Sequence, residues 1–492
     1  MVLLSRHLNL FLILIPLFLG ISNGCQGLSD AYSKGAEDRG FMQITVSEKG
    51  LNFVKTILVQ QALQSLVLLH IPVIKKSFYF PLIAHFNAEV YNSSIVNVEV
   101  PVSSIQLGTE GINIITSEVE VNLTMQWKYY YTTWLVPDPV SDEGRAFVTI
   151  EGMEVGITLK LDEQNGSLYL ITMECGTYLK DITIDLDGGA SWFYQGFVDA
   201  FEGEIRAAVE NAVTSKIKEG IIKLDSLLQN LPKEIGVDGN VAMNFTVMQA
   251  PDVGPKSISI GVEGLFVTMT PDFRVHRLSN LQPGISCSGS SKMLEIALSD
   301  TVLNSAAEVY TNEGLLNWLV DKLPEQSLLN TASWRFIIPK LYKMYPNDDM
   351  KLNISVSSPP IITITSEGVE AVVIADMIID VMDGDDTIPV ACVSMTISAN
   401  GLMDVSGNNI IGAANLQNLS LKLKWSNVGD FHMRFIQAVV QTLVKDVLLP
   451  LINVQLKKGF PLPIIRNFRV QNADVIYDES QLVVCTDVQY AI

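Results

Sequence analysis

Hydrophobic residues recur at helical spacing along a proline-free stretch from Ser191 to Leu224. The apolar stripe of this stretch comprises Phe193, Phe197, Phe201, Ile205, Ala208 and Ala212. At ~1.5 Å per residue the predicted helix is roughly 50 Å long, far above the ~11–12 residue average. Three glycines inside it, Gly196, Gly203 and Gly220, each weaken a helix by about 1 kcal/mol relative to alanine. We therefore expect tertiary packing of the apolar stripe to hold the helix together.

Two other stretches show helical periodicity. One runs from Gly50 to His70, and its apolar face comprises Leu51, Val54, Leu58 and Ala62. The other runs from Asp430 to Leu456, and its apolar face comprises Phe431, Phe435, Ala438, Val439 and Leu443. Lys55 interrupts the first and Lys445-Asp446 the second. These interruptions favour amphipathic helices over membrane spans.

Strand periodicity fills the segments between the helices. From Glu118 to Tyr131 apolar and polar residues alternate almost without a break. The residues on the apolar side are Val119, Val121, Leu123, Met125, Trp127, Tyr129 and Tyr131. Such a strand is long compared with the usual ~5–6 residues. Long strands next to a long amphipathic helix predict a strongly curved sheet with the helix lying along its inner face.

The second half of the chain repeats the first. ITVSEKGLNFVKTIL, from Ile44, corresponds to IALSDTVLNSAAEVY, from Ile296, and the segments around Gly111 and Gly368 also correspond. These pairs of landmarks are separated by similar lengths of chain, which indicates two homologous domains in tandem. We place the boundaries at 25–235 and 259–492, with a linker and central sheet at 236–258.

The N-terminus has the pattern of a secretory signal. Arg6 and His7 precede an apolar run from Leu8 to Leu19, and small residues then lead to Gly24. We predict a signal peptide over 1–24 and an extracellular protein. Six N-glycosylation sequons agree with passage through a secretory lumen, at Asn92, Asn122, Asn165, Asn244, Asn353 and Asn418.

The net charge and the absence of catalytic motifs exclude several classes of function. The 492-residue chain has a formal net charge of −20 and is 48% hydrophobic, which argues against a nucleic-acid partner and against disorder. The histidines have no metal-ligand spacing, and neither a nucleophile elbow nor a phosphate loop is present. Asp383, Asp385 and Asp386 are typical of a solvent-exposed hairpin turn rather than of a calcium-binding loop. We therefore expect no enzyme activity, no metal and no cofactor.

Five motifs carry a family resemblance. They are FVTIEGMEVGITLKL from Phe147, GGASWFYQGFVDAF from Gly188, SLLQNLPKEIGVD from Ser226, SSKMLEIALSDTVLNSAAEVY from Ser290 and SQLVVCTDVQ from Ser480. The chain resembles the family of bactericidal/permeability-increasing protein and lipopolysaccharide-binding protein, and most closely its plant secreted members. The resemblance implies an α+β boomerang. Two elongated barrels, each a twisted antiparallel sheet wrapped around a long helix, are joined by a central sheet.

The resemblance also implies ligands. An apolar pocket in each barrel is expected to hold phospholipid acyl chains. The residues predicted to line these pockets are Leu51, Val54, Leu58, Phe193, Phe197, Phe201 and Ile205 in the first barrel, and Phe431, Phe435 and Val439 in the second. Bacterial lipopolysaccharide is expected at the tip of the first barrel, with transient contact to membrane surfaces. The residues predicted to form that tip are Lys75, Lys76, Trp127, Lys128, Tyr130 and Trp134.

The chain departs from the family pattern at two places. The resemblance implies a disulfide between a cysteine that matches Cys175 and a cysteine on the long helix. The second position falls near Val213 or Thr214 in this chain, so this disulfide cannot form. Cys392 and Cys485 are the candidate pair in the second half, and we expect little loss of stability on reduction. The tip keeps Trp127-Lys128, but other positions that are basic in animal members are uncharged in this chain. The whole region of residues 41–250 has 13 Lys+Arg against 25 Asp+Glu.

Two functions therefore remain in competition. The leading hypothesis is a sensing or defence protein that binds phospholipid and lipopolysaccharide. The alternative is an extracellular shuttle that transfers phospholipid or sterol without recognising microbes. A hydrolase is a third class, for which the sequence offers no motif.

Overall fold

The computed structural model describes most of the chain. The described residues are 40–67, 69, 71–79, 85–132, 138–187, 191–268, 286–287, 292–323, 326–464 and 467–490. The predicted signal peptide and Trp134 lie outside the described residues, as do the side chains of Phe193 and Phe197.

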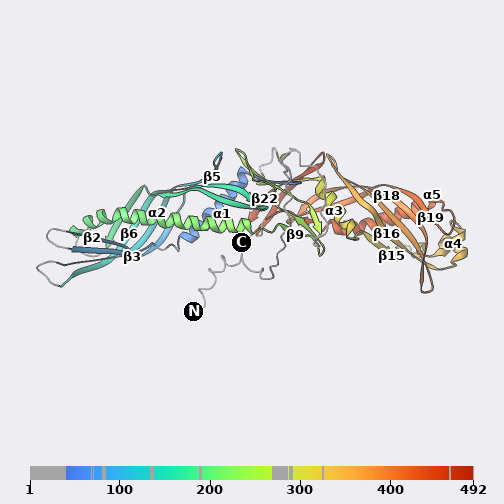
Figure 1. Cartoon of the computed structure of the whole chain (residues 1–492), viewed down its shortest axis with the longest axis horizontal. Coiled ribbons are helices and arrows are strands. Elements are labelled where there is room, and N and C mark those ends of the chain that lie inside the picture. The colour runs from blue at the N-terminus through green and yellow to red at the C-terminus, as the bar shows by residue number, and fades with distance from the viewer. Residues whose placement is uncertain are drawn as a thin grey trace. The chain divides into compact units, whose positions relative to one another are not determined.

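The first half is an antiparallel sheet with one long helix along it. The sheet order is β2-β3-β5-β6-β7, with β4 paired to β5 and β8 paired to β6. The strands are β2 (Ile74–Phe78), β3 (His85–Glu99), β4 (Val102–Gly108), β5 (Gly111–Thr132), β6 (Val140–Gln164), β7 (Ser167–Tyr178) and β8 (Asp181–Asp187). The helices are α1 (Glu48–Leu66) and α2 (Ser191–Gln229). Helix α2 runs along the sheet (Figure 1), and its 39 residues make it longer than predicted.

The alternation of apolar and polar residues along β5 determines which of its side chains enter the hydrophobic core of the first half. Val121, Leu123 and Met125 are fully buried, and they pack with Phe201 and Ile205 of α2. Polar residues between them face the other side of the sheet. The predicted strand register and the inward stripe of the long helix are therefore confirmed for these residues.

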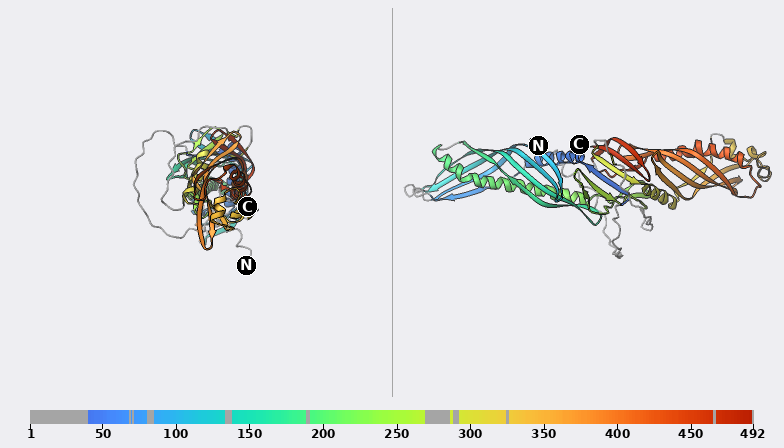
Figure 2. Two further views of the ribbon diagram at one scale, coloured as in Figure 1. Left: turned by 90° about the vertical axis from the view of Figure 1, so that its right-hand side faces the viewer. Right: turned by 90° about the horizontal axis from the view of Figure 1, so that it is seen from above.

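The second half repeats this plan. Its sheet has the order β15-β16-β17-β18-β19-β20. The strands are β15 (Asn317–Val320), β16 (Asp349–Thr365), β17 (Gly368–Asp383), β18 (Asp386–Ser406), β19 (Asn409–Ser426) and β20 (Phe460–Pro461). The helices are α3 (Asp300–Asn312), η1 (Gln326–Leu329), η2 (Thr331–Trp334), α4 (Pro339–Met344), α5 (Met433–Leu443), the π-helical turn η3 (Val444–Leu448) and α6 (Leu449–Leu456). The top view shows α2 and the α5–α6 region each lying along its own sheet (Figure 2).

The predicted C-terminal helix is interrupted. Pro450 follows the π-helical turn between α5 and α6, and proline has no N–H to continue the α-helical ladder. By length and composition alone Met433–Leu456 could cross a membrane. Its inward residues Ile436, Val440 and Leu443 instead pack into the core of the second sheet.

A central sheet joins strands from both halves. Its order is β11-β12-β1-β14-β22-β21. The strands are β1 (Met42–Ser47), β11 (Asp252–Val253), β12 (Ser257–Val262), β14 (Leu294–Ser299), β21 (Phe468–Asp478) and β22 (Gln481–Tyr490). A small sheet of β9 (Glu234–Gly236), β10 (Val241–Asn244) and β13 (Phe266–Thr268) completes the described strands. The fold is therefore the α+β arrangement predicted, with open twisted sheets in which no closed ring of strands is found among the described residues.

The internal repeat appears directly in the strand pairing. β1 and β14 lie antiparallel, and Ile44 pairs with its own sequence counterpart Ile296. Each strand leads straight into a helix, at Ser47 and at Ser299. The other landmark glycines, Gly111 and Gly368, both have φ between 130° and 145° and both open a long strand. The duplication is thus a structural repeat about a local two-fold arrangement.

The disulfide differs from the predicted one. Cys287 is bonded to Cys485 in β22, whereas Cys392 is a free, buried thiol. Cys392 lies in β18, where it pairs with Ile378 and Trp425. Cys485 lies in the central sheet, a different layer of the fold. The predicted Cys392–Cys485 pair is therefore wrong, because the two thiols belong to separate sheets.

Cys175 does not form the disulfide that the family resemblance implied for the first half. Cys175 is free, and burial raises the pKa of its thiol. Thr214 on α2 hydrogen-bonds through its hydroxyl to that of Thr177, at 3.0 Å. A polar contact of side chains therefore joins α2 to β7 close to the position where the family resemblance implied a cysteine pair.

Candidate functional site

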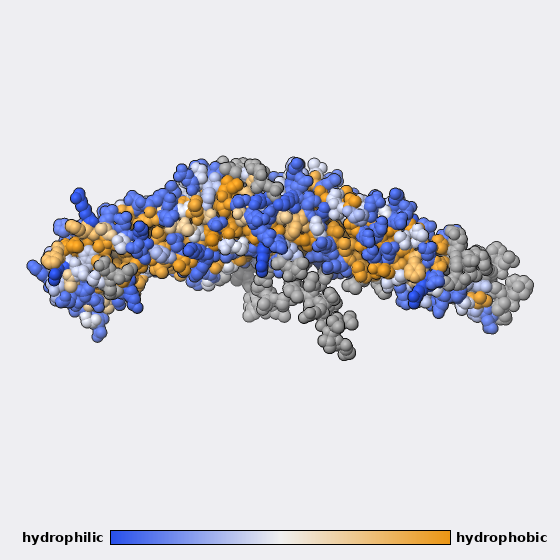
Figure 3. All heavy atoms as spheres, turned by 180° about the vertical axis from the view of Figure 1, so that it is seen from behind, coloured by the Kyte–Doolittle hydropathy of each residue, from blue (hydrophilic) through white to orange (hydrophobic). Residues whose placement is uncertain are grey.

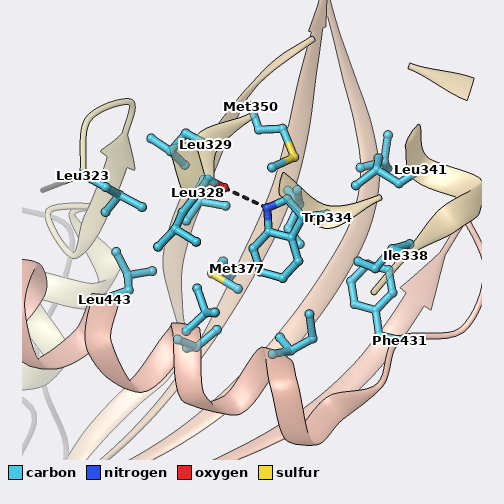
Figure 4. A pocket seen from close by; sticks show the side chains of 16 residues that line it. Leu323, Leu328, Leu329, Trp334, Ile338, Leu341, Met350, Met377, Phe431 and Leu443 are labelled. Carbon is cyan, nitrogen blue, oxygen red and sulfur yellow. Dashed lines mark hydrogen bonds between the residues drawn. The ribbon is translucent and has the colours of Figure 1, made fainter. Parts of the chain in front are cut away.

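A cavity lies in the second half, between α5, the sheet and the segment from η1 to α4. Sixteen side chains line it: Leu323, Leu328, Leu329, Trp334, Ile338, Leu341, Met350, Leu352, Met377, Ile379, Val390, Phe431, Ile436, Val439, Val440 and Leu443. Figure 4 shows them converging from the sheet, from α5 and from the η2–α4 segment. The space enclosed among these side chains is about 40 Å³, and the figure rises to about 560 Å³ when space open to solvent is included.

Local sequence patterns build this pocket. On α5, Ile436, Val440 and Leu443 follow helical spacing and face the sheet. On the other wall, Trp334, Ile338 and Leu341 follow the same spacing through η2 and α4. The indole N–H of Trp334 donates to the Leu328 carbonyl at 2.9 Å, which orients the ring toward the cavity (Figure 4).

The chemistry of the lining is uniform. None of these sixteen side chains is ionisable, and the one polar donor among them, the Trp334 indole, is already satisfied inside the wall. Such a pocket offers dispersion contacts and exclusion of water, and it has no group for proton transfer or metal binding. It suits a hydrocarbon chain.

Of the three residues predicted to line the pocket of the second half, the structure places two in the cavity. Phe431 and Val439 line the cavity. Phe435 is 62% exposed, so its assignment to the pocket was wrong. The predicted stripe was off by one position at this turn, because Ile436 occupies the inward place. The wall from Leu323 to Leu341 was missed, although Trp334, Ile338 and Leu341 show helical spacing.

In the first half, some of the residues predicted to line a pocket are buried and others are not. Phe201 and Ile205 are buried in the sheet core, and Leu51 is buried on α1. Leu58 is half-buried. Val54 is 41% exposed, so it does not line an interior pocket as predicted. Val54 lies on the same helix face as Gly50 and Leu51, but only Gly50, Leu51 and Leu66 of α1 are buried, so the cover of this face does not extend to Val54.

The predicted aromatic tip is largely a core. Trp127 is only 1% exposed, so its assignment as a surface contact was wrong. It belongs to the apolar side of β5, where its ring stacks on Tyr129 at 5.9 Å between centroids, and Tyr129 stacks on Tyr131 at 6.3 Å. Tyr130 faces outward as predicted and is 49% exposed.

The three lysines of this tip are held by carboxylates. Glu89 on β3 forms ion pairs with Lys128 and, at 3.5 Å, with Lys75. Lys76 pairs with Glu204 on α2 at 3.1 Å. The hydrogen bond with Lys128 lowers the pKa of Glu89 and raises the pKa of Lys128, so both stay charged at neutral pH. The predicted cationic tip is therefore largely neutralised from within.

This neutralisation predicts the effect of one mutation. Glu89→Gln removes the shared counter-charge of Lys75 and Lys128 and should increase binding to vesicles that contain anionic phospholipid. One added unit of positive charge near such a surface is worth about 1 kcal/mol, or roughly fivefold in affinity, at low salt. Vesicle co-sedimentation at two salt concentrations measures it. Glu99→Gln, on the same strand, is the matched control, and equal gains in both variants would contradict a local role of Glu89.

The six sequons occupy different environments. Asn92, Asn165, Asn353 and Asn418 are exposed, and Asn122 is half-buried on the polar side of β5. Asn244 donates to Glu263 at 2.6 Å and accepts from the Thr246 backbone N–H at 2.9 Å. A glycan on Asn244 would be attached at Nδ2, the atom that donates to Glu263, so this sequon fits glycosylation least.

Both halves match models of one family. Residues 50–231 match the LBP / BPI / CETP family N-terminal domain, and residues 236–490 match the C-terminal domain. A BPI/LBP family protein of Arabidopsis thaliana is 46% identical over 453 residues, covering 92% of each chain. A bactericidal permeability-increasing protein of Sebastes schlegelii is 25% identical, covering 91% of this chain and 95% of that relative.

A solved structure shows the same fold. The crystal structure of a lipopolysaccharide binding protein superimposes with a TM-score of 0.61, at 20% identity, over 92% of this chain and 100% of that one. Fold and both family models thus agree along nearly the whole described chain. This chain belongs to the LBP / BPI / CETP family.

Proposed function

We propose that this protein is a secreted, non-enzymatic lipid-binding protein that holds phospholipid by its acyl chains. The observation that carries the proposal is the pocket of the second half, whose sixteen lining side chains include no ionisable group. Family membership supports the lipid class, and the N-terminal signal pattern supports secretion.

Two neighbouring residues on α5 allow a direct test. Val439 lines the pocket, whereas Ala438 is exposed on the outer side of the same helix. Val439→Trp should fill the cavity and reduce the lipid that co-purifies with the protein, while Ala438→Trp should leave it unchanged. Lipid extraction and native mass spectrometry give the lipid bound per protein. Full lipid occupancy in the folded Val439→Trp variant would contradict the proposal.

Recognition of lipopolysaccharide is the second candidate function. Several relatives are named lipopolysaccharide-binding protein, at 21–23% identity. The ion pairs of Lys75, Lys76 and Lys128 with Glu89 and Glu204 oppose strong attraction to an anionic headgroup at the first tip. We therefore place lipid holding and exchange ahead of microbial sensing. Titration of lipid A against a neutral phospholipid distinguishes them, since a sensor prefers the first and a shuttle does not.

A further inference from the structure

The segment from η2 through α4 has two different faces. Its inner face contributes Trp334, Ile338 and Leu341 to the pocket. Its outer face presents Phe336, which is 80% exposed and the most exposed large hydrophobic side chain among the described residues. A single short wall therefore separates an apolar cavity from an apolar side chain in water.

Three basic residues lie in the same segment as Phe336. Within residues 326–347 there are three basic residues, Arg335, Lys340 and Lys343, and no acidic residue, in a chain of net charge −20. All three are exposed, and none has a carboxylate within ion-pair distance in the part of the chain that the structure describes. This differs from the first tip, where Lys75, Lys76 and Lys128 are all paired.

Met344, at the end of α4, extends this outer face and is exposed. The Lys340 side chain lies beside Gly429, just before α5, with 3.6 Å between the Lys340 Cδ and a β-carbon built on that glycine. We call Arg335, Phe336, Lys340, Lys343 and Met344 the α4 surface. In Figure 3 the α4 end lies at the left, where hydrophobic and hydrophilic residues lie side by side.

We propose that the α4 surface docks the protein onto an anionic phospholipid bilayer, so that lipid enters the pocket directly behind it. The proposal rests on the proposed function for the identity of the pocket's ligand. Phe336 would insert among the acyl chains, while Arg335, whose guanidinium lies 4.6 Å from the Phe336 ring centroid, stays with the lipid phosphates. Exposed apolar residues beside unpaired cations are typical of interfacial binding.

Acidic residues border this surface on one side. Asp349 begins β16 and pairs with Met382, next to the β17–β18 turn that carries Asp383, Asp385 and Asp386. Their repulsion from anionic lipid favours an approach from the side of Phe336. It also makes the insertion of Phe336, rather than net charge, the larger contribution to binding.

The test uses the full-length protein and vesicles of phosphatidylcholine with or without phosphatidylglycerol. Phe336→Ser should weaken co-sedimentation with the mixed vesicles by about tenfold or more, given the free energy of burying one phenylalanine. Arg335→Gln, Lys340→Gln and Lys343→Gln should each cost up to about fivefold on mixed vesicles, and little on pure phosphatidylcholine. Ile222→Ser, at an apolar position 68% exposed on α2, is the matched control and should bind as the unaltered protein does.

A second assay separates this inference from the proposed function. Binding of a soluble, monomeric fluorescent fatty acid reports on the pocket without a bilayer, and Phe336→Ser should leave it unchanged. If Phe336→Ser keeps full vesicle binding while the fatty acid binds normally, the α4 surface is not the docking site and the pocket stands. If instead Phe336→Ser dissociates a dimer in the absence of vesicles, the surface joins two copies and the inference is overturned. If the fatty acid does not bind the unaltered protein, the proposed function itself fails.

Discussion

Replacing Cys287 by serine is expected to lower the free energy of unfolding by about 2–5 kcal/mol. The Cys287–Cys485 bond joins positions 198 residues apart, and the chain-entropy estimate for such a loop is near 5 kcal/mol. Cys485 is fully buried in β22, so the bond holds the segment at Cys287 against the central sheet. Denaturant unfolding of the oxidised protein, with and without the substitution, measures the difference.

The free thiols supply the controls for this prediction. Cys175→Ser should change stability little, because its thiol is only half-buried and unbonded. Cys392→Ala removes a buried thiol and should cost only the small amount expected for one sulfur atom in a core. Were Cys287→Ser to cost little and Cys392→Ala to cost about 2–5 kcal/mol, Cys392 and not Cys287 would be the partner of Cys485. Reductant should lower the melting temperature of the unaltered protein, contrary to the expectation from sequence.

The overall fold could be predicted because it depends on patterns that extend over many residues. The alternation along β5 and the stripe of Phe201 and Ile205 each fix which side chains face inward. The repeat was visible because Ile44 and Ile296 begin similar strand-to-helix segments. Long patterns tolerate single exceptions, and so they determine sheets and helices reliably.

The candidate site could be predicted only in part, because it depends on contacts between segments distant in the chain. Phe431 and Val439 were identified from helical spacing, but the facing wall with Trp334 became visible only once α4 was placed against α5. The partner of Cys485 lies 198 residues away, and cysteine spacing does not specify pairing. Similarly, nothing in the order of residues shows that Glu89 faces both Lys75 and Lys128.

Trp127 shows how the choice between core and surface can reverse a functional prediction. The alternation along the strand placed Trp127 on the apolar side, whereas the family resemblance placed it with Lys128 in a lipid-contacting tip. In the structure its indole N–H donates to the Arg145 carbonyl at 2.9 Å. Its ring lies across Gly144 on the neighbouring strand, where a β-carbon would come within 2.7 Å of the indole. The residue is therefore a part of the core that only glycine opposite can accommodate.

Trp127→Ala should accordingly destabilise the protein by about 3–5 kcal/mol, the range for removing a large buried aromatic side chain. The loss combines a cavity beneath β5 with the lost hydrogen bond from the indole to the Arg145 carbonyl. Thermal or denaturant unfolding monitored by circular dichroism measures it. Tyr130→Ala, three residues along the same strand and exposed, is the matched control and should change stability by less than about 0.5 kcal/mol.

Lipid binding by these two variants then separates the two roles. At temperatures where Trp127→Ala is still folded, binding of a monomeric fatty acid to the second-half pocket should be unchanged, because Trp127 packs in the core of the first sheet. Loss of binding should appear only in parallel with loss of the folded signal. A Trp127→Ala variant of unaltered stability with weakened lipid binding would show that the indole contacts ligand after all, and would return the aromatic stretch of β5 to the candidate site.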